Sequence, residues 1–229
     1  MTPLHRHQIA WLSDVAWQQV QEVQAHTWDA VAQECLQHWA SHRLPLVVTR
    51  QTASEMPRSV ALGLPAPARW DKRRITLAVP RSAVLYFDAF PRALEVQCLL
   101  PLPARAPWLG LCEQLSACHA TARVYGSYGW QRLTGLDHVH ADSDIDLCIA
   151  VSNASQADAV AALLQGFAAP RVRLDGELVF DDGAAVAWRE WAAWRAGRSN
   201  AVLVKRLLGA TLERAPFWHS TLPRPLALA

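Results

Sequence analysis

Several features that mark membrane, secreted and metal-thiolate proteins are missing from this sequence. Its 229 residues include no run of about 18 apolar residues, so we expect no transmembrane helix and no membrane partner. The first residues lack the charged head, apolar stretch and small-residue cleavage site of a secretory signal, which predicts a cytoplasmic protein. The five cysteines are an odd number and include no Cys-x-x-Cys pair. That count argues against a disulfide framework and against a zinc site of the usual spacing.

Lysine is also scarce, because Lys72 and Lys205 are the only lysines among 22 basic residues. The formal net charge of +2 is far from the strongly basic balance of a nucleic-acid binder, so we expect no nucleic-acid partner. Arginine supplies the other basic residues, and its planar guanidinium can grip phosphate with two hydrogen bonds. A compositional bias of the genome explains most of these arginines more simply. The hydrophobic content of 52% is ample for a buried core.

Prolines gather between residues 63 and 107 and interrupt regular structure there. We therefore predict a small N-terminal module over residues 1–85 and a larger domain over residues 86–229. In the module, Thr27 is expected to cap a helix that stops before Pro45. Predicted strands cover 46–49, 74–79, 121–125, 143–151 and 171–180, and predicted helices cover 108–118, 127–133, about 153–167 and 186–196. The alternation in the second half is typical of a layered domain of helices and strands.

The first candidate site is Gly126-Ser127, which follows the strand over 121–125 and precedes a predicted helix. A glycine there lets backbone N–H groups approach an anion, and the helix N-terminus adds partial positive charge. Ser127 adds a hydroxyl donor. By itself this pair is a weak signal, because Gly-Ser begins many turns.

The second candidate is the acidic entry to the strand over 143–151. Alternation along a strand places Asp144 and Asp146 on one face, with Ile145 and Leu147 on the other. Two carboxylates so close repel each other unless a cation lies between them, and Mg²⁺ prefers such oxygen ligands together with substrate phosphates. The alternative is a solvated strand start at which the aspartates serve as turn or cap residues.

A metal site of this kind needs a further carboxylate from a neighbouring strand. The strand over 171–180 offers two, Asp175 and Glu177, which share a face by the same alternation. Gly176 between two acids is a poor choice for a strand that is purely structural. The sequence favours Asp175 slightly and does not decide between the two.

These motifs together carry a family resemblance. Gly126-Ser127, then Asp144-Ile145-Asp146, then a later acidic strand resemble the nucleotidyltransferase superfamily of polymerase-β-like enzymes, with a longer stretch between Ser127 and Asp144 than its commonest members have. The run over 124–147 resembles the phosphoribosyl-dephospho-CoA transferases of malonate decarboxylase, also called holo-acyl-carrier-protein synthases. Arg6-His7 and the stretches 63–74 and 171–190 share that resemblance, which therefore covers most of the chain.

The resemblance implies an α+β fold: a polymerase-β-like nucleotidyltransferase domain with a mixed sheet, preceded by a smaller N-terminal α/β module. It implies transfer of a phosphoribosyl-dephospho-CoA group from a triphosphoribosyl-dephospho-CoA donor to a serine of the apo acyl-carrier subunit of malonate decarboxylase, with release of pyrophosphate. In this reading Asp144 and Asp146 bind Mg²⁺, and Asp175 or Glu177 holds a second metal or acts as base. Gly126 and Ser127 would seat the departing pyrophosphate, in a cleft between module and domain.

Basic residues supply candidates for binding the donor phosphates. Lys72 and Arg73 lie in a short basic cluster that faces the donor, faces an acidic carrier, or is a solvated strand edge. Lys205 and Arg132 are further phosphate-binding candidates, and Arg132 is equally well explained as a surface residue. Trp130 is either a core residue or a platform for the adenine of the donor.

Two other functions stay open at this stage. A different nucleotidyltransferase that uses ATP on a small molecule or a protein would need the same aspartates. A non-catalytic binding protein on the same fold would be expected to have lost one of the acids, and all of them are present here.

Overall fold

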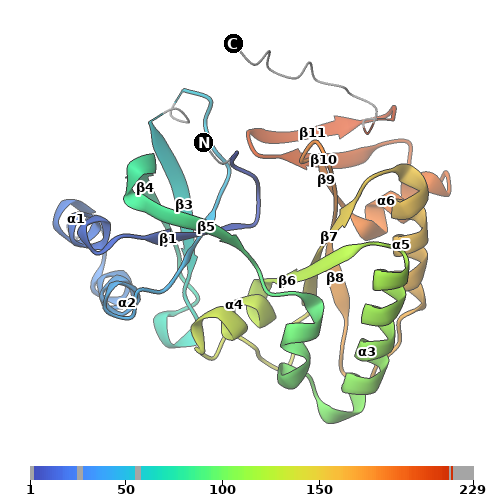
Figure 1. Cartoon of the computed structure of the whole chain (residues 1–229), viewed down its shortest axis with the longest axis horizontal. Helices are drawn as coiled ribbons and strands as arrows, with labels where there is room; N and C mark the ends of the chain where they lie inside the picture. The colour runs from blue at the N-terminus through green and yellow to red at the C-terminus, as the bar shows by residue number, and fades with distance from the viewer. Residues whose placement is uncertain (1–2, 25–27, 55–57, 217, 219–229) are drawn as a thin grey trace.

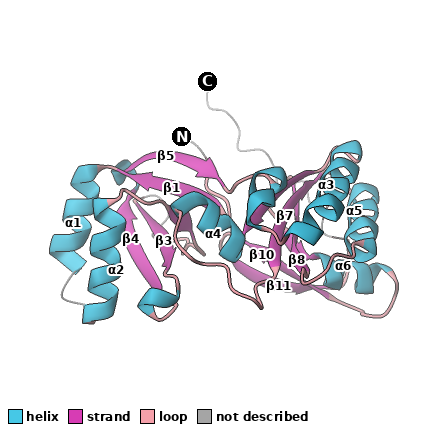
Figure 2. Cartoon of the chain, turned by 90° about the horizontal axis from the view of Figure 1, so that it is seen from below, coloured by secondary structure: helices cyan, strands magenta, loops and turns pink. Residues whose placement is uncertain are grey.

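The chain folds around two separate β-sheets. The computed structural model describes residues 3–24, 28–54, 58–216 and 218. Within them one sheet has the strand order β4-β3-β2-β1-β5 and the other the order β11-β10-β9-β8-β7-β6. Figures 1 and 2 show the two sheets side by side, with helices at the two outer ends and α4 between the sheets. Helices and strands together with a mixed second sheet confirm the predicted α+β fold.

The first sheet is antiparallel throughout and belongs to the N-terminal half of the chain. Its strands are β1 (Gln8–Leu12), β2 (Leu46–Val48), β3 (Ser59–Pro65), β4 (Arg74–Pro80) and β5 (Val84–Ala89). The helices α1 (Asp14–Gln24) and α2 (Ala30–Ser41) pack against it, and the short 3-10 helices η2 (Ala68–Trp70) and η3 (Arg81–Ala83) flank β4. Because β5 pairs with β1, this sheet extends beyond the predicted boundary at residue 85. The predicted cap Thr27 lies outside the described residues, and the side chain of Asp29 caps α2.

The second sheet is mixed, because β7 runs parallel to β8 and antiparallel to β6. Its strands are β6 (Thr121–Tyr125), β7 (Ile145–Val151), β8 (Leu174–Phe180), β9 (Ala185–Ala187), β10 (Val202–Arg206) and β11 (Gly209–Glu213). The helices are η4 (Ala93–Leu99), α3 (Leu102–Ala117), α4 (Gly126–Thr134), α5 (Ala154–Gly166) and α6 (Trp188–Arg195). Lys205 therefore lies on a strand.

Two of the predicted element boundaries are wrong for identifiable reasons. Helix α3 begins at Leu102 and not at 108, because Pro101 and Pro103 occupy its cap and first turn, where a proline costs no hydrogen bond, and Pro107 is accommodated inside it. The segment predicted as a helix from residue 186 first completes the short strand β9 and turns helical only at Trp188.

The two faces of the second sheet differ in character. Val124, Leu147 and Leu178 are buried in the core beneath α3, α5 and α6. By strand alternation, Tyr125, Asp146 and Glu177 point to the opposite face. A small apolar cluster that includes residues of β1 and α4 joins the two halves of the chain; its buried members are Ile9, Phe90 and Trp130. Among the described residues, none of the helices has the length and apolar character needed to span a membrane.

Candidate active site

Three strands bring the predicted site together at one edge of the second sheet. β6 ends where β7 begins, so Tyr125 pairs with Asp146. β7 and β8 run parallel, so Asp146 pairs on its other side with Asp175. The sequence places these residues up to 50 positions apart, and the strand register alone makes them neighbours. The predicted acidic motifs therefore meet beside the start of α4.

Gly126 packs directly against the Asp146 carboxylate. Its φ of +59° lies in the left-handed region, and a β-carbon at this position would overlap the Asp146 side chain. Both facts require glycine at the turn that starts α4. Ser127 follows as the second residue of the helix, so the helix N-terminus and the carboxylate lie at the same place.

Asp146 is held among other acids. Burial and the negative charges of Asp175, Asp144 and Glu177 raise its pKa from 3.8 to about 6. Asp144 has one cationic partner, because its Oδ1 accepts a hydrogen bond of 2.7 Å from Nε of the exposed Arg173. Burial and the negative charges of Glu177, Asp146 and Asp175 raise the pKa of Tyr125 far above its ordinary value, so its hydroxyl remains protonated.

This donor set suits a hard cation. Asp144, Asp146 and Asp175 offer only carboxylate oxygens, and the raised pKa of Asp146 shows negative charge that the protein itself does not neutralise. In the described part of the chain, no three His, Cys, Asp or Glu side chains are gathered into a metal-binding group. These residues alone therefore offer no more than one or two carboxylates to a cation, and an ion such as Mg²⁺ would need substrate phosphates and water to complete its shell.

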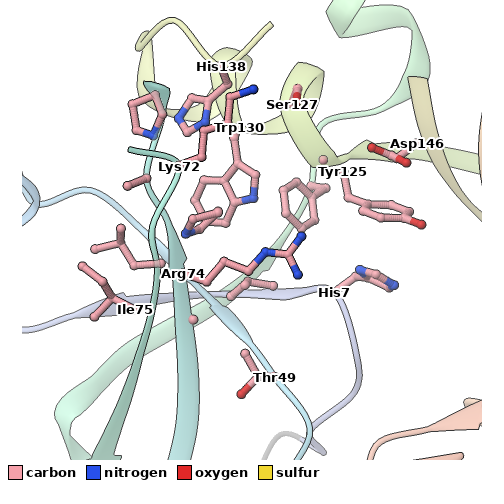
Figure 3. Close-up of a pocket in the computed structure, with 18 of the residues that line it drawn as sticks. His7, Thr49, Lys72, Arg74, Ile75, Tyr125, Ser127, Trp130, His138 and Asp146 are labelled. Carbon is pink, nitrogen blue, oxygen red and sulfur yellow. The ribbon is translucent and has the colours of Figure 1, made fainter. Parts of the chain in front are cut away.

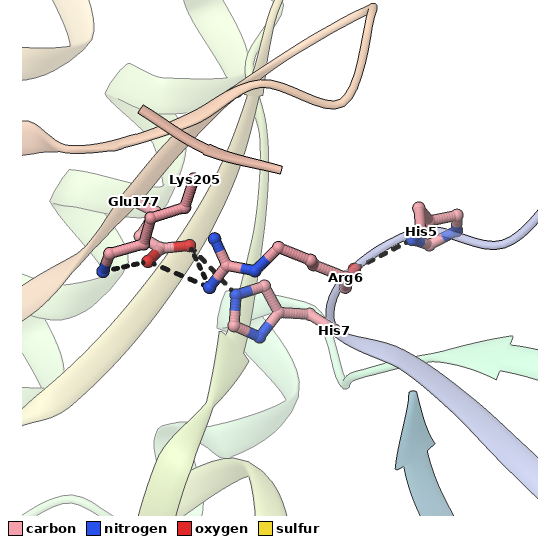
Figure 4. Close-up of polar contacts among 5 residues, drawn as sticks. All are labelled: His5, Arg6, His7, Glu177 and Lys205. Carbon is pink, nitrogen blue, oxygen red and sulfur yellow. Dashed lines mark hydrogen bonds and ion pairs between the residues drawn. The ribbon is translucent and has the colours of Figure 1, made fainter. Parts of the chain in front are cut away.

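Glu177 has the opposite environment, although it lies only two residues after Asp175. Its buried carboxylate accepts a hydrogen bond of 2.7 Å from Lys205 and lies 3.1 Å from Nε2 of His7 and 3.2 Å from Arg6 (Figure 4). Burial alone would raise the pKa of Glu177, but these partners outweigh it and lower the pKa to about 2. The adjacent Gly176 has a φ of +130°, and a β-carbon there would overlap the backbone of β7.

A cavity of about 590 Å³ lies between the two halves of the chain and opens beside Gly126, Ser127 and Asp146. This volume is within the usual range of roughly 300–1,000 Å³ for small-molecule sites. The N-terminal half contributes residues of β2, β3 and β4, such as Arg74, and Lys72 from the turn before β4. Figure 3 shows Tyr125, Asp146 and His7 on one side of the cavity and Lys72 and Trp130 on the other.

Three of the predicted phosphate-binding residues are engaged away from this cavity. Arg73 pairs with Asp29, and Lys205 pairs with Glu177. The guanidinium of Arg132 donates to the backbone carbonyl of Glu95. None of the three lines the cavity, whereas Lys72 does. Trp130 does so as well, but it is buried and packs edge-to-face on Phe90.

His7, to which the sequence analysis assigns no chemical role, also lines the cavity. His138 lines it too; its Nε2 is buried and has no hydrogen-bond partner among the described residues. Burial lowers the pKa of His138 to about 4, so this imidazole is neutral at physiological pH. The family resemblance includes Arg6-His7 but assigns His7 no role, and the place of both histidines in the cavity depends on how the two halves pack.

Comparisons with known proteins cover nearly the whole described chain. Residues 5–90 match the family model described as "Phosphoribosyl-dephospho-CoA transferase MdcG N-terminal domain", and residues 92–216 match the one described as "Phosphoribosyl-dephospho-CoA transferase MdcG C-terminal domain". A phosphoribosyl-dephospho-CoA transferase of Xanthomonas axonopodis pv. citri is 37% identical over 87% of this chain and 89% of its own length. One of Bradyrhizobium diazoefficiens is 35% identical over 90% of this chain and 88% of its own. No solved structure matches the chain.

Proposed function

The chain belongs to the phosphoribosyl-dephospho-CoA transferase family and is therefore a transferase; we propose its donor from the family and the site, and its acceptor from the family. The donor is triphosphoribosyl-dephospho-CoA, and the acceptor is a serine of the acyl-carrier subunit of malonate decarboxylase. The serine oxygen displaces pyrophosphate and remains joined to the transferred group through a phosphodiester.

The observation that carries this proposal is the contact between Gly126 and Asp146 at the mouth of the cavity. It brings a helix N-terminus, which favours phosphate, against a carboxylate that lacks a positive partner. A triphosphate accompanied by a divalent cation complements both features at once. A neutral ligand would leave the charge of Asp146 uncompensated.

Each part of the site then has a definite task. Asp144 and Asp146 would hold Mg²⁺, with Asp175 beside them, and the ion would offset the charge that develops on the phosphates. The backbone N–H groups at the start of α4 and the hydroxyl of Ser127 would bind the pyrophosphate as it leaves. From across the cavity, Lys72 would add positive charge to the phosphate site.

The test compares two donors with the purified protein, Mg²⁺ and a purified apo carrier subunit. Intact mass of the carrier and released pyrophosphate are measured with triphosphoribosyl-dephospho-CoA and, separately, with ATP. A carrier heavier by one phosphoribosyl-dephospho-CoA unit, with ATP inert, is the expected result. Turnover of ATP alone would replace the proposed donor and keep the metal site. No turnover of either donor would show that the proposed donor and acceptor are wrong.

Asp146→Asn is the matched inactive variant, because it keeps the shape of the side chain and removes the charge that holds the cation. Arg73→Ala is the control variant, since Arg73 pairs with Asp29 and does not line the cavity. We expect the first to abolish modification of the carrier and the second to leave it within about twofold of the parent.

A further inference from the structure

One histidine of the N-terminal half lies in the cavity together with the acidic site. His7 directly precedes β1, and its ring lies against that of Tyr125, with the centroids 4.2 Å apart. It lines the same cavity as Ser127 and Asp146 (Figure 3). Its φ of +59° is a backbone conformation that side-chain-bearing residues rarely adopt. Such strain persists only where surrounding contacts hold the residue in place, and it is concentrated at functional sites.

Those contacts come mainly from Glu177. Nε2 of His7 lies 3.1 Å from Oε2 of Glu177, while Lys205 and Arg6 bind the same carboxylate (Figure 4). With two cationic partners, the carboxylate is ionised at neutral pH and can only accept hydrogen bonds. Neutral His7 must therefore carry its hydrogen on Nε2, which leaves a lone pair on Nδ1. Within the described residues, Nδ1 of His7 has no hydrogen-bond partner.

The other groups near the site are less suited to accept a proton. Two further imidazoles line the cavity: that of His138 has its pKa lowered to about 4 by burial, and that of His140 is exposed. Glu177 is charge-paired on both oxygens, Tyr125 stays protonated, and Asp146 belongs to the proposed cation site. Asp175 is exposed and remains the main competitor, because its carboxylate is accessible. An informative experiment must therefore distinguish His7 from Asp175 as the proton acceptor.

We propose that His7 is the general base that takes the proton from the acceptor hydroxyl, and that Glu177 positions its imidazole. This inference rests on the proposed function. In the step, the serine oxygen forms a bond to the α-phosphorus of the donor, and the bond from that phosphorus to the bridging oxygen of pyrophosphate breaks. Pyrophosphate leaves with the electron pair of the broken bond, and the serine proton passes to Nδ1 of His7, which later releases it to water.

The left-handed backbone at His7 allows an unusually clean test. Glycine adopts a φ near +59° without strain, so His7→Gly keeps the backbone and leaves a space the size of an imidazole. We expect kcat for carrier modification to fall by about 10²–10⁴-fold, with KM for the donor within about twofold of the parent. Added imidazole should restore kcat in a saturable manner, while an equal concentration of sodium chloride should not.

A second variant and a control keep the test independent of folding. His7→Gln retains a donor toward Glu177 but has no basic nitrogen, so it should be as slow as His7→Gly and unresponsive to imidazole. His5→Gln changes an exposed ring that hydrogen-bonds only the backbone carbonyl of Arg6, and should keep the parent kcat. Asp175→Asn should stay sensitive to loss of His7 if His7 is the base.

The positioning role of Glu177 has its own readout. Glu177→Gln should lower kcat more than it changes KM for the donor. Combined with His7→Gly, it should cost little further kcat, because the carboxylate then has no imidazole to orient. A role limited to holding the fold would instead lower kcat by the same factor in both backgrounds.

The outcomes separate the base from the function. If the parent protein does not modify the carrier, the proposed function is wrong, whatever His7 does. If the parent is active and His7→Gly and His7→Gln keep kcat within threefold of it, His7 is not the base. If imidazole fails to restore kcat of a slow His7→Gly variant, and Asp175→Asn also lowers kcat strongly, Asp175 is the base and His7 is not.

Discussion

Replacing Asp146 with asparagine should make the metal-free protein more stable while it destroys the proposed activity. Burial and the neighbouring acids raise the pKa of Asp146 from 3.8 to about 6, a difference of about two units. Each unit corresponds to about 1.4 kcal/mol, which would give about 3 kcal/mol for a fully buried group. Because the side chain is only half-buried, solvent screening reduces the expected gain to about 1–2 kcal/mol. Asparagine keeps the shape and removes the repelled charge.

The gain should depend on pH in a definite direction. The pKa of Asp146 is higher in the folded protein than in the unfolded chain, so the folded state binds more protons between pH 3.8 and about 6. The parent protein therefore loses this contribution to its stability as the pH rises through that window. The advantage of Asp146→Asn should be small near pH 4 and complete at pH 7.

Urea unfolding in EDTA, at pH 4.5 and at pH 7.5, measures both quantities. Asp181→Asn serves as control, because Asp181 is an exposed turn residue without an ion pair among the described residues. Adding Mg²⁺ at 100 times its dissociation constant should then stabilise the parent by about 2.7 kcal/mol and the variant by much less. A variant that is less stable than the parent in EDTA at pH 7.5 would refute the conclusion that repelled charge is concentrated on Asp146.

Three further substitutions test the cavity and its supports. In urea unfolding, Gly126→Ala should lower the free energy of unfolding by clearly more than Gly135→Ala. Both glycines have a positive φ, at which an alanine costs about 1–2 kcal/mol. Only at Gly126 does the Asp146 carboxylate occupy the place of the added methyl group. Lys72→Ala should raise KM for the donor about tenfold in steady-state assays, with Arg73→Ala unchanged, because only Lys72 lines the cavity. Glu177→Ala should cost about 1–3 kcal/mol in urea unfolding, since it removes the buried carboxylate and leaves the partly buried Arg6 and Lys205 unpaired. A cost below about 0.5 kcal/mol would contradict a stabilising ion cluster.

Local patterns in the sequence were sufficient for most of the second half of the fold. The alternation over 143–151 and the helical pattern over about 153–167 correctly indicated β7 and α5. The secondary structure was predicted wrongly where the local sequence allows two structures and tertiary contacts determine which one forms. The short β9 forms because its residues pair with β8 and β10, and the proline-rich start of α3 is helical because its apolar side, including Trp108, is buried.

The site was predictable only as far as strand alternation reaches. Alternation placed Asp144 with Asp146 on one face of a strand, and Asp175 with Glu177 on one face of another. It does not predict which residue of the first strand lies beside which residue of the second. The parallel register of β7 and β8 sets Asp175 beside Asp146 and moves Glu177 one step further along the sheet. Its partner His7 lies 170 residues away in sequence, so no spacing rule connects them.

Glu177 and Asp146 show that the chain uses one buried charge for folding and leaves another, half-buried, for a ligand. Glu177 is neutralised by Arg6 and Lys205, so the protein satisfies this carboxylate itself and uses it to join the two halves. Asp146, on the same face of the sheet, has acids as its neighbours and an elevated pKa, so its charge is satisfied only by a ligand from outside. The difference arises because Arg6 of the N-terminal half reaches Glu177, whereas the charged neighbours of Asp146 are all acids. An unfavourable charge at Asp146 costs folding free energy, and in the proposed function a bound cation, with the donor phosphates as its further ligands, would offset that cost.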